Sequence, residues 1–239
     1  MRFSTLTLLI CCTLSCLAWP TERPFKVQVI EIKDEVWPKM IIEGPIATDP
    51  LTAVALYYDL DNQHSYIPDL PISLPIKHLS PTEVHTYYER KLPWPFEKGV
   101  YVNGTTLEKL PNGHRVKWYQ VYNPDSLEAT GSATFVAHPE GSWMTYETFV
   151  RPKSFFAGII KKIFQKETLA ALYALRDHVE SVSKHSPDLT DKYRQYILQA
   201  YRGVAPYEPI IKENATKIER IQKEISKLDQ LKAEGKVEL

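Results

Sequence analysis

Cysteine is nearly absent from this sequence of 239 residues. The three cysteines, Cys11, Cys12 and Cys16, all lie within the first 16 positions. A chain cleaved after this stretch would contain no disulfide bond, no cysteine nucleophile and no thiolate metal site. Glycine is also scarce, with 9 residues against 18 prolines, which favours stiff, extended connections over flexible ones.

A surplus of charge of one sign is absent as well. The 29 basic side chains balance the 29 acidic ones, whereas a nucleic-acid-binding domain is normally basic. We therefore expect no nucleic-acid partner. Hydrophobic residues make up 44% of the chain and charged residues 24%, so there is enough apolar surface for a globular core.

The common motifs of catalysis and metal binding are also missing. The sequence contains no zinc-protease helix motif, no glycine-rich phosphate loop and no nucleophile elbow. Its seven histidines are scattered, and no two of them have the spacing of metal ligands on a helix. The sequence thus predicts no metal site, no cofactor and no catalytic residue.

The first 18 residues have the pattern of a secretory signal peptide. Arg2 supplies the positive start, residues 6–17 are apolar, and Cys16-Leu17-Ala18 has the spacing of a cleavage site. This pattern predicts cleavage after Ala18 and a periplasmic or secreted mature protein. The apolar run is shorter than the roughly 20 residues that span a membrane. An uncleaved anchor and a lipoprotein site at Cys16 remain as alternatives.

Most of the central sequence is predicted to form strands. Residues 27–32 and 36–46 are strand-like, and Asp49-Pro50 then begins a helix, because Asp caps helices and Pro fits their first turn. Prolines between residues 68 and 75 exclude a long helix there. Short turns such as Pro111-Asn112-Gly113 separate the later strands, which predicts an antiparallel meander of residues 84–92, 100–110, 116–122, 129–137 and 142–150.

The C-terminal part is predicted to be helical. Apolar residues recur at helical spacing from Ile160 to Val182, which predicts one long helix over residues 154–182. A second helix is expected over residues 189–201. Residues 212–232 are highly charged but have one apolar side, formed by Ile218, Ile221, Ile225, Leu228 and Leu231. That side either folds back on the domain or forms a dimerising coiled coil that would give a homo-oligomer.

Several short motifs resemble those of START-like and polyketide-cyclase-like proteins, the SRPBCC superfamily. Residues 36–44 (VWPKMIIEG) and 47–54 (ATDPLTAV) resemble the opening of these domains. Residues 92–96 (LPWPF) with Tyr101-Val102 resemble their strand with a Pro-aromatic-Pro bend. Residues 143–146 (WMTY) with Arg151-Pro152 resemble the last strand and its exit into the final helix.

This resemblance implies an α+β helix-grip fold, in which a curved antiparallel β-sheet wraps around a long C-terminal helix. It divides the chain into a signal peptide (1–18), an extended lead-in (19–35), a START-like helix-grip domain (36–184) and a helical C-terminal extension (185–239). The space between sheet and helix is usually an apolar cavity. The candidate ligand-binding residues are the large side chains Tyr88, Trp94, Phe96, Trp118, Tyr122, Phe135, Tyr146, Phe149, Phe156, Ile160, Leu172 and Leu175.

One further segment, at the start of the predicted long helix, is both basic and amphipathic. Such a pattern is typical of helices that lie at a membrane surface, although a core helix with lysines on its wet side has the same pattern. The residues expected to contact a membrane are Lys153, Phe155, Phe156, Lys161 and Lys162.

Three functions follow as hypotheses. The first is an exported binding protein that holds a lipid or another hydrophobic small molecule and transfers it to or from a membrane. The second is a cyclase- or hydrolase-type enzyme that uses Glu89, Glu147, His85 and Tyr146 as acids and bases. The third is an interaction scaffold that acts through the C-terminal helix.

Overall fold

The computed structural model describes residues 23–91, 98–153 and 157–233. Within them, eight strands form one antiparallel sheet in the order β1-β2-β8-β7-β6-β5-β4-β3. The strands are β1 (Lys26–Ile30), β2 (Lys39–Ile46), β3 (Ile72–Ser80), β4 (Glu83–Lys91), β5 (Lys98–Leu110), β6 (Gly113–Tyr122), β7 (Ser126–His138) and β8 (Gly141–Pro152). The helices are α1 (Pro50–Tyr57), the short 3-10 helix η1 (Gln63–Ser65), α2 (Ala157–His185), α3 (Pro187–Tyr201), α4 (Glu208–Glu213) and α5 (Ala215–Ala233).

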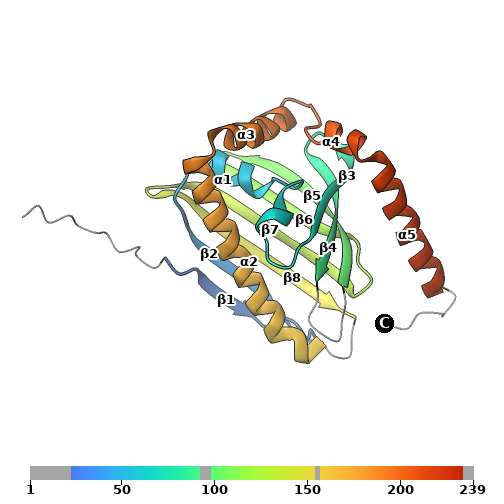
Figure 1. Cartoon of the computed structure of the whole chain (residues 1–239). Helices are drawn as coiled ribbons and strands as arrows, with labels where there is room; N and C mark the ends of the chain where they lie inside the picture. The colour runs from blue at the N-terminus through green and yellow to red at the C-terminus, as the bar shows by residue number, and fades with distance from the viewer. Residues whose placement is uncertain (1–22, 92–97, 154–156, 234–239) are drawn as a thin grey trace, which may run out of the picture.

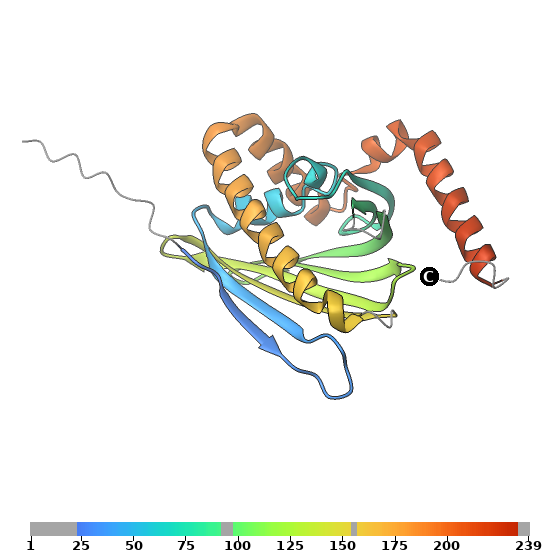
Figure 2. The same cartoon turned by 60° about the horizontal axis from the view of Figure 1, so that its bottom comes forward.

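The sheet forms one layer and α2 lies across it (Figure 1). Turned by 60°, the molecule shows α1, α2 and α3 on the same side of the sheet, with the β1-β2 hairpin reaching away from them (Figure 2). The predicted α+β helix-grip fold, with its curved antiparallel sheet and long C-terminal helix, is confirmed.

Side-chain alternation decides which face of the sheet meets α2. Along β2, every second residue is buried, as expected for a strand with one covered face. The main core lies on this covered side, where Phe135 of β7 and Met144 of β8 pack with Leu56 of α1, Val179 of α2 and Ile197 of α3. Helix α3 is therefore part of the same core. The division predicted after residue 184 was drawn by resemblance and stays a prediction.

Strand β3 was missed because of its prolines. Pro75 lies inside it, opposite Thr86 of β4, and the pairing register shifts directly afterwards. Proline cannot donate a hydrogen bond to a sheet, so it is tolerated in an edge strand or at a bulge. In the described sheet β3 is an edge strand, which explains how a proline-rich segment can still pair.

Helix α5 packs on the face of the sheet that points away from α2. Its Ile218 and Ile221 are buried against a second apolar cluster that includes Leu74, Tyr87 and Val102. Of the two alternatives for the charged tail, the structure therefore shows the helix folded back on the domain. The predicted helix over residues 212–232 is divided, because α4 ends at Glu213 and α5 begins at Ala215.

Helix α1 begins at the predicted cap. Asp49 Oδ1 accepts hydrogen bonds from the backbone nitrogens of Leu51 and Thr52, each at 3.1 Å. Oδ2 accepts one from the Thr52 hydroxyl at 2.6 Å and lies 3.1 Å from Nη1 of Arg194 on α3. Partial burial of Asp49 favours its protonated form, but these hydrogen bonds and the Arg194 charge outweigh that effect and lower the pKa of the carboxyl below its ordinary value of 3.8.

We expect Asp49→Ala to lower the free energy of unfolding by about 1 kcal/mol, the usual value of a helix cap. Asp49→Asn is the matched control, because its one amide oxygen keeps the cap acceptor for the backbone of Leu51 and Thr52, while the charge and the second oxygen, which faces the Thr52 hydroxyl and Arg194, are lost. Since the folded state lowers this pKa, its contribution is full above pH 3.8 and fades as the pH falls below it. Urea unfolding at pH 7 and pH 3 measures both effects; an Asp49→Ala penalty that is equal at both pH values would contradict this account.

Candidate ligand cavity

A cavity of about 210 Å³ lies between α2 and the covered face of the sheet. Three structural elements form its wall: the middle strands, α2, and the loop between α1 and β3. The strand residues include Tyr88, Arg90, Tyr101, Asn103, Thr105, Val116, Trp118, Tyr146 and Thr148. Helix α2 adds Phe164, Thr168, Ala171, Leu172 and Leu175, which share one side of the helix by their spacing.

Stacked aromatic rings form the sheet side of the cavity. The Trp118 and Tyr146 ring centroids are 5.0 Å apart with planes 30° from parallel, and Tyr88 and Tyr101 form a second stacked pair at 5.0 Å. Burial raises the pKa of Tyr146 to about 12 and that of Tyr88 well above its ordinary value. These phenols therefore stay neutral and keep their hydroxyl donors at physiological pH.

Gly131 allows Trp118 to lie flat on the sheet. The two residues are direct partners across β6 and β7, and a Cβ built on Gly131 would overlap both the Trp118 ring and the carbonyl oxygen of Glu147. The absence of a side chain at this position thus fixes the depth of the cavity floor.

The loop wall is held by a buried polar cluster. Tyr66 donates a hydrogen bond to Asp59 Oδ1 at 2.8 Å, and its ring stacks on His178 of α2 at a centroid distance of 3.8 Å. His178 Nε2 lies 3.3 Å from Asp59 Oδ2, and Asn62 donates to the same oxygen at 2.9 Å. Burial raises the pKa of the fully buried Asp59, although these three partners oppose the shift. Tyr66 is therefore fixed to the loop and to α2 at once.

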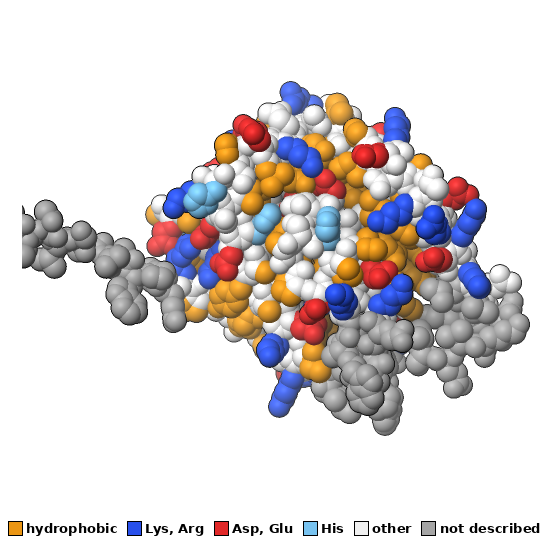
Figure 3. All heavy atoms as spheres, viewed as in Figure 1, with side chains coloured by type: hydrophobic (Ala, Val, Ile, Leu, Met, Phe, Trp, Pro, Cys, Tyr) orange, Lys and Arg blue, Asp and Glu red, His pale blue; other side chains and the backbone are white. Residues whose placement is uncertain are grey.

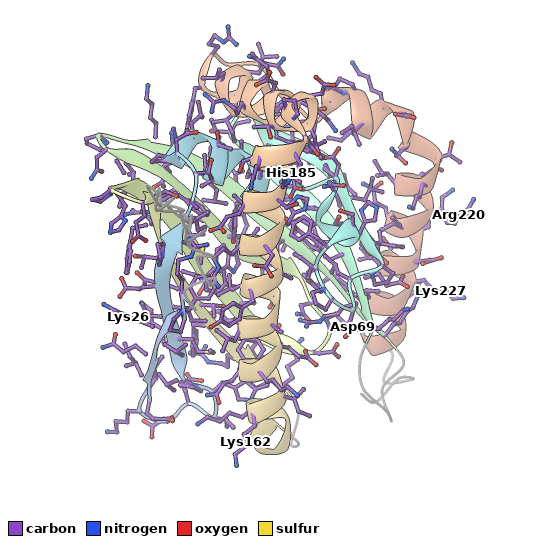
Figure 4. The ribbon with its side chains drawn as sticks, turned by 60° about the vertical axis from the view of Figure 1, so that its left-hand side comes forward. Lys26, Asp69, Lys162, His185, Arg220 and Lys227 are labelled. Carbon is purple, nitrogen blue, oxygen red and sulfur yellow. The ribbon has the colours of Figure 1, made fainter. Side chains whose placement is uncertain are left out.

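The same loop is also tied to the sheet. The amide of Lys91, at the end of β4, donates a hydrogen bond of 2.8 Å to the carbonyl oxygen of Asp69. Figure 4 labels Asp69 in this loop, on the side of α2 that faces β4. Strand, loop and helix thus enclose the cavity from three directions.

Arg90 is the only charged residue among the described cavity-lining residues. Its Nη2 forms an ion pair of 2.9 Å with Oε2 of Glu167 on α2. Its Nε is buried and has no hydrogen-bond partner among the described residues. One cationic group with an unused donor therefore lies in a wall that is otherwise neutral.

The structure brings together five of the twelve sequence-predicted ligand-binding residues at this cavity. These are Tyr88, Trp118, Tyr146, Leu172 and Leu175. Phe135 also faces α2, but it is fully buried against Tyr57 in the solid part of the core. Trp94, Phe96 and Phe156 lie outside the described residues, as does the side chain of Ile160.

Two predicted residues belong to the opposite face of the sheet, so their assignment to the cavity is wrong. Tyr122 packs with the second apolar cluster under α5. Phe149 follows Thr148, which lines the cavity, and therefore points the other way; the Arg151 guanidinium lies 5.8 Å from its ring centre. The face of the sheet on which each of these two side chains lies depends on the pairing register of its strand, which the sequence alone does not give.

Sequence reasoning also missed several residues of the cavity wall, above all Arg90, Tyr101 and Tyr66. A signal for Arg90 existed, because it is two positions from Tyr88 and side chains two apart share one face of a strand. Gln63 begins the three-residue helix η1 and Tyr66 follows it, and so short a segment has no periodicity from which the direction of a side chain could be predicted.

The side chains suggested for catalysis mostly face away from the cavity. Glu89 pairs with Lys98 at 3.2 Å, Glu147 with Lys39 at 2.5 Å, and His85 lies 3.3 Å from the Tyr119 hydroxyl, all on the outer face. Of the four candidates, only Tyr146 lines the cavity.

The basic start of α2 is partly used within the chain. Lys161 pairs with Glu31 at 3.0 Å, while Lys153 and Lys162 are exposed, and Lys162 points away from the molecule at one end of α2 (Figure 4). Phe155 and Phe156 lie outside the described residues. On the face seen in Figure 3, acidic and basic side chains are interspersed. No described helix has the length and apolar character needed to span a membrane.

Oligomerisation through the C-terminal helix stays a prediction, but fewer of its apolar residues are free to contact a second copy of the chain. Ile218 and Ile221 are covered within the chain, Ile225 is half-buried beside them, and the side chain of Leu228 lies outside the described residues.

We expect Gly131→Ala to disturb the cavity floor, since its methyl group must displace Trp118 or the β8 backbone. Overpacking of this kind costs about 1–3 kcal/mol. Ser132→Ala, one residue further along the same strand, is the control and should change stability by less than about 0.5 kcal/mol. Chemical unfolding of both variants measures the difference; equal stabilities would show that Trp118 does not depend on the glycine.

Neither a family model nor a curated protein matches the sequence, but solved structures do. A fragment of a STAR-related lipid transfer protein from Xanthomonas axonopodis superposes with a TM-score of 0.59 and 23% identity, covering 65% of this chain and 93% of that one. Human STARD10 superposes with a TM-score of 0.57 and 14% identity, covering 68% and 77%.

An aromatase/cyclase, Zhui from Streptomyces sp. R1128, superposes with a TM-score of 0.50 and 9% identity, covering 67% of this chain and 98% of that one. At such identities the similarity concerns the fold. The resemblance seen in the sequence motifs is thereby confirmed at the level of the fold: the chain has a helix-grip fold like that of START domains.

Proposed function

We propose that this chain is a binding protein that holds a hydrophobic small molecule between α2 and the sheet. The observation that carries the proposal is the cavity of about 210 Å³ with its two stacked aromatic pairs. Concave, mostly apolar sites with a few fixed polar groups are typical of small-molecule binding. The similarity to structures named as lipid transfer proteins supports it.

The binding energy would come mainly from desolvation of the ligand. Each buried methylene contributes about 0.8 kcal/mol, and an aromatic ring stacked on Trp118 or Tyr88 adds about 0.5–1.5 kcal/mol. Leu172 and Leu175 close the cavity from the helix side, and both are almost completely buried. A ligand would thus be enclosed between rings on one side and leucines on the other.

We further propose that the protein is exported and exchanges its ligand with a membrane. Export depends on the pattern of residues 1–18, and exchange on the exposed lysines near the start of α2.

Filling the cavity tests the binding proposal. We expect Leu172→Trp to occupy the space and to weaken binding of 2-naphthol, a neutral two-ring probe, by at least about ten-fold, since lost contact area is lost transfer free energy. Leu172→Met keeps the volume and should bind as the native chain does. Isothermal titration calorimetry on folded samples measures both; no 2-naphthol binding by the native chain, or equal binding by Leu172→Trp, would contradict the proposal.

The export proposal predicts a mature N-terminus at Trp19. Expression of the full chain in a host with a secretory pathway, followed by N-terminal sequencing of the exported fraction, measures the cleavage site. Intact Met1 on protein retained in the cytoplasm would overturn it.

A further inference from the structure

The volume of the cavity restricts its occupant. At about 210 Å³ it lies between an engineered cavity of about 150 Å³, which binds benzene, and the pockets of about 300–1,000 Å³ that take drug-sized ligands. One ring fits with space remaining, and two fused rings come close to filling it. A diacyl lipid or a sterol would need additional volume.

The shape of the wall favours a flat molecule. Trp118 of β6 stacks with Tyr146 of β8 across Gly131 of β7, and Tyr88 of β4 stacks with Tyr101 of β5, so two extended ring systems face the interior from the sheet. Aromatic pairs are stable when their ring centres are about 4.5–7 Å apart in offset or edge-on geometry. A flexible chain would gain less from such surfaces, and it would lose more conformational entropy on binding.

The charge in the wall adds a polar requirement. Arg90 lines the cavity beside the Tyr88–Tyr101 pair, since it is two positions from Tyr88 on the same face of β4. Its charge opposes the effect of burial on the pKa values of Tyr101 and Tyr146. Glu167 occupies Nη2 of its guanidinium, whereas the buried Nε has no partner among the residues that the structure describes. A buried donor without a partner costs free energy that an acceptor on a ligand would recover.

A carboxylate fits this donor arrangement better than a neutral acceptor. The planar guanidinium presents its N–H groups as a fork that matches the two oxygens of a carboxylate, and such charge-assisted bonds are about twice as strong as neutral ones. Glu167 already shows that a carboxylate reaches this position from α2. A ligand carboxylate would take the unused Nε and compete with Glu167 for the remainder of the guanidinium.

We therefore propose, as a refinement that depends on the proposed function, that the ligand is a compact aromatic carboxylate of one or two rings. Its rings lie between the Trp118–Tyr146 and Tyr88–Tyr101 pairs and the leucines of α2, and its carboxylate binds Arg90 with Glu167 as internal competitor.

Two probes with the same ring system separate this proposal from general hydrophobic binding. 2-Naphthoate carries a carboxylate at the position where 2-naphthol carries a neutral hydroxyl. At neutral pH we expect the full chain to bind 2-naphthoate about ten- to a hundred-fold more tightly, the range expected for a hydrogen bond to a charged group. In Arg90→Gln this preference should disappear while 2-naphthol binding is retained.

Two further variants make the test independent of how well Arg90→Gln folds. Glu167→Gln removes the internal competitor from the helix side and should strengthen 2-naphthoate binding several-fold without changing 2-naphthol binding. Arg115→Gln is the matched control, because Arg115 also lies on a strand and faces a glutamate, Glu108 at 3.8 Å, but on the outer face of the sheet. It should leave both affinities unchanged.

Three outcomes would contradict the proposal, each in a different way. Equal binding of the two naphthalene probes by the native chain would remove the carboxylate and leave a general hydrophobic site. Tighter binding of palmitate than of either probe would overturn the compact-ring ligand class while supporting the binding function. No binding of any of the three by the native chain would overturn the proposed function and this inference together.

Discussion

Burial of α2 against the covered face of the sheet is the interaction on which the rest of the structure depends. At one end of this contact, α1 is inserted between helix and sheet, and Leu56, Phe135, Met144 and Val179 pack with almost no exposed surface. Beyond α1, the described residues do not fill the gap between α2 and the sheet. Phe164 and Leu172 face the stacked rings of the strands, and a cavity remains between them. Solid core and cavity are thus two halves of one interface.

The side chains around a cavity of about 210 Å³ make fewer packing contacts than they would in a solid core. Two local arrangements keep the cavity wall in place. Gly131 leaves room for Trp118 to lie flat on the sheet, and Asp59 with His178 holds Tyr66 in the wall. A ligand in this space would recover the lost contacts, which is why a binding function accounts for the architecture.

Burial also affects the polar groups of the cavity wall. Arg90 at the border of the cavity is 26% exposed, and among the described residues Glu167 pairs with its Nη2 while its buried Nε has no partner. The phenols of Tyr88 and Tyr146 remain neutral because burial raises their pKa values. The cavity thus combines desolvated donors with flat apolar surfaces, and such a combination discriminates between ligands more sharply than an entirely apolar space would.

Local sequence signals predicted most of the elements but not the directions of all side chains. The cap at Asp49, the turn before Gly113 and the periodicity up to Val182 each have a local physical cause, and each appears where it was expected. Pro75 hid β3, because edge position is a property of the whole sheet. Tyr122 and Phe149 were placed in the cavity because strand register is set by partners distant in sequence. Arg90 is charged, so an apolar pattern does not predict it in the cavity wall, although its spacing from Tyr88 places it on the same face.

The most direct test is native mass spectrometry of the full chain purified from its own source, followed by organic extraction and identification of what is released. The account predicts one small molecule bound at near-stoichiometric amount, retained in Leu172→Met and lost in Leu172→Trp. A native chain that has only its own mass, and that takes up nothing from a mixture of aromatic acids, naphthols and fatty acids, would contradict it.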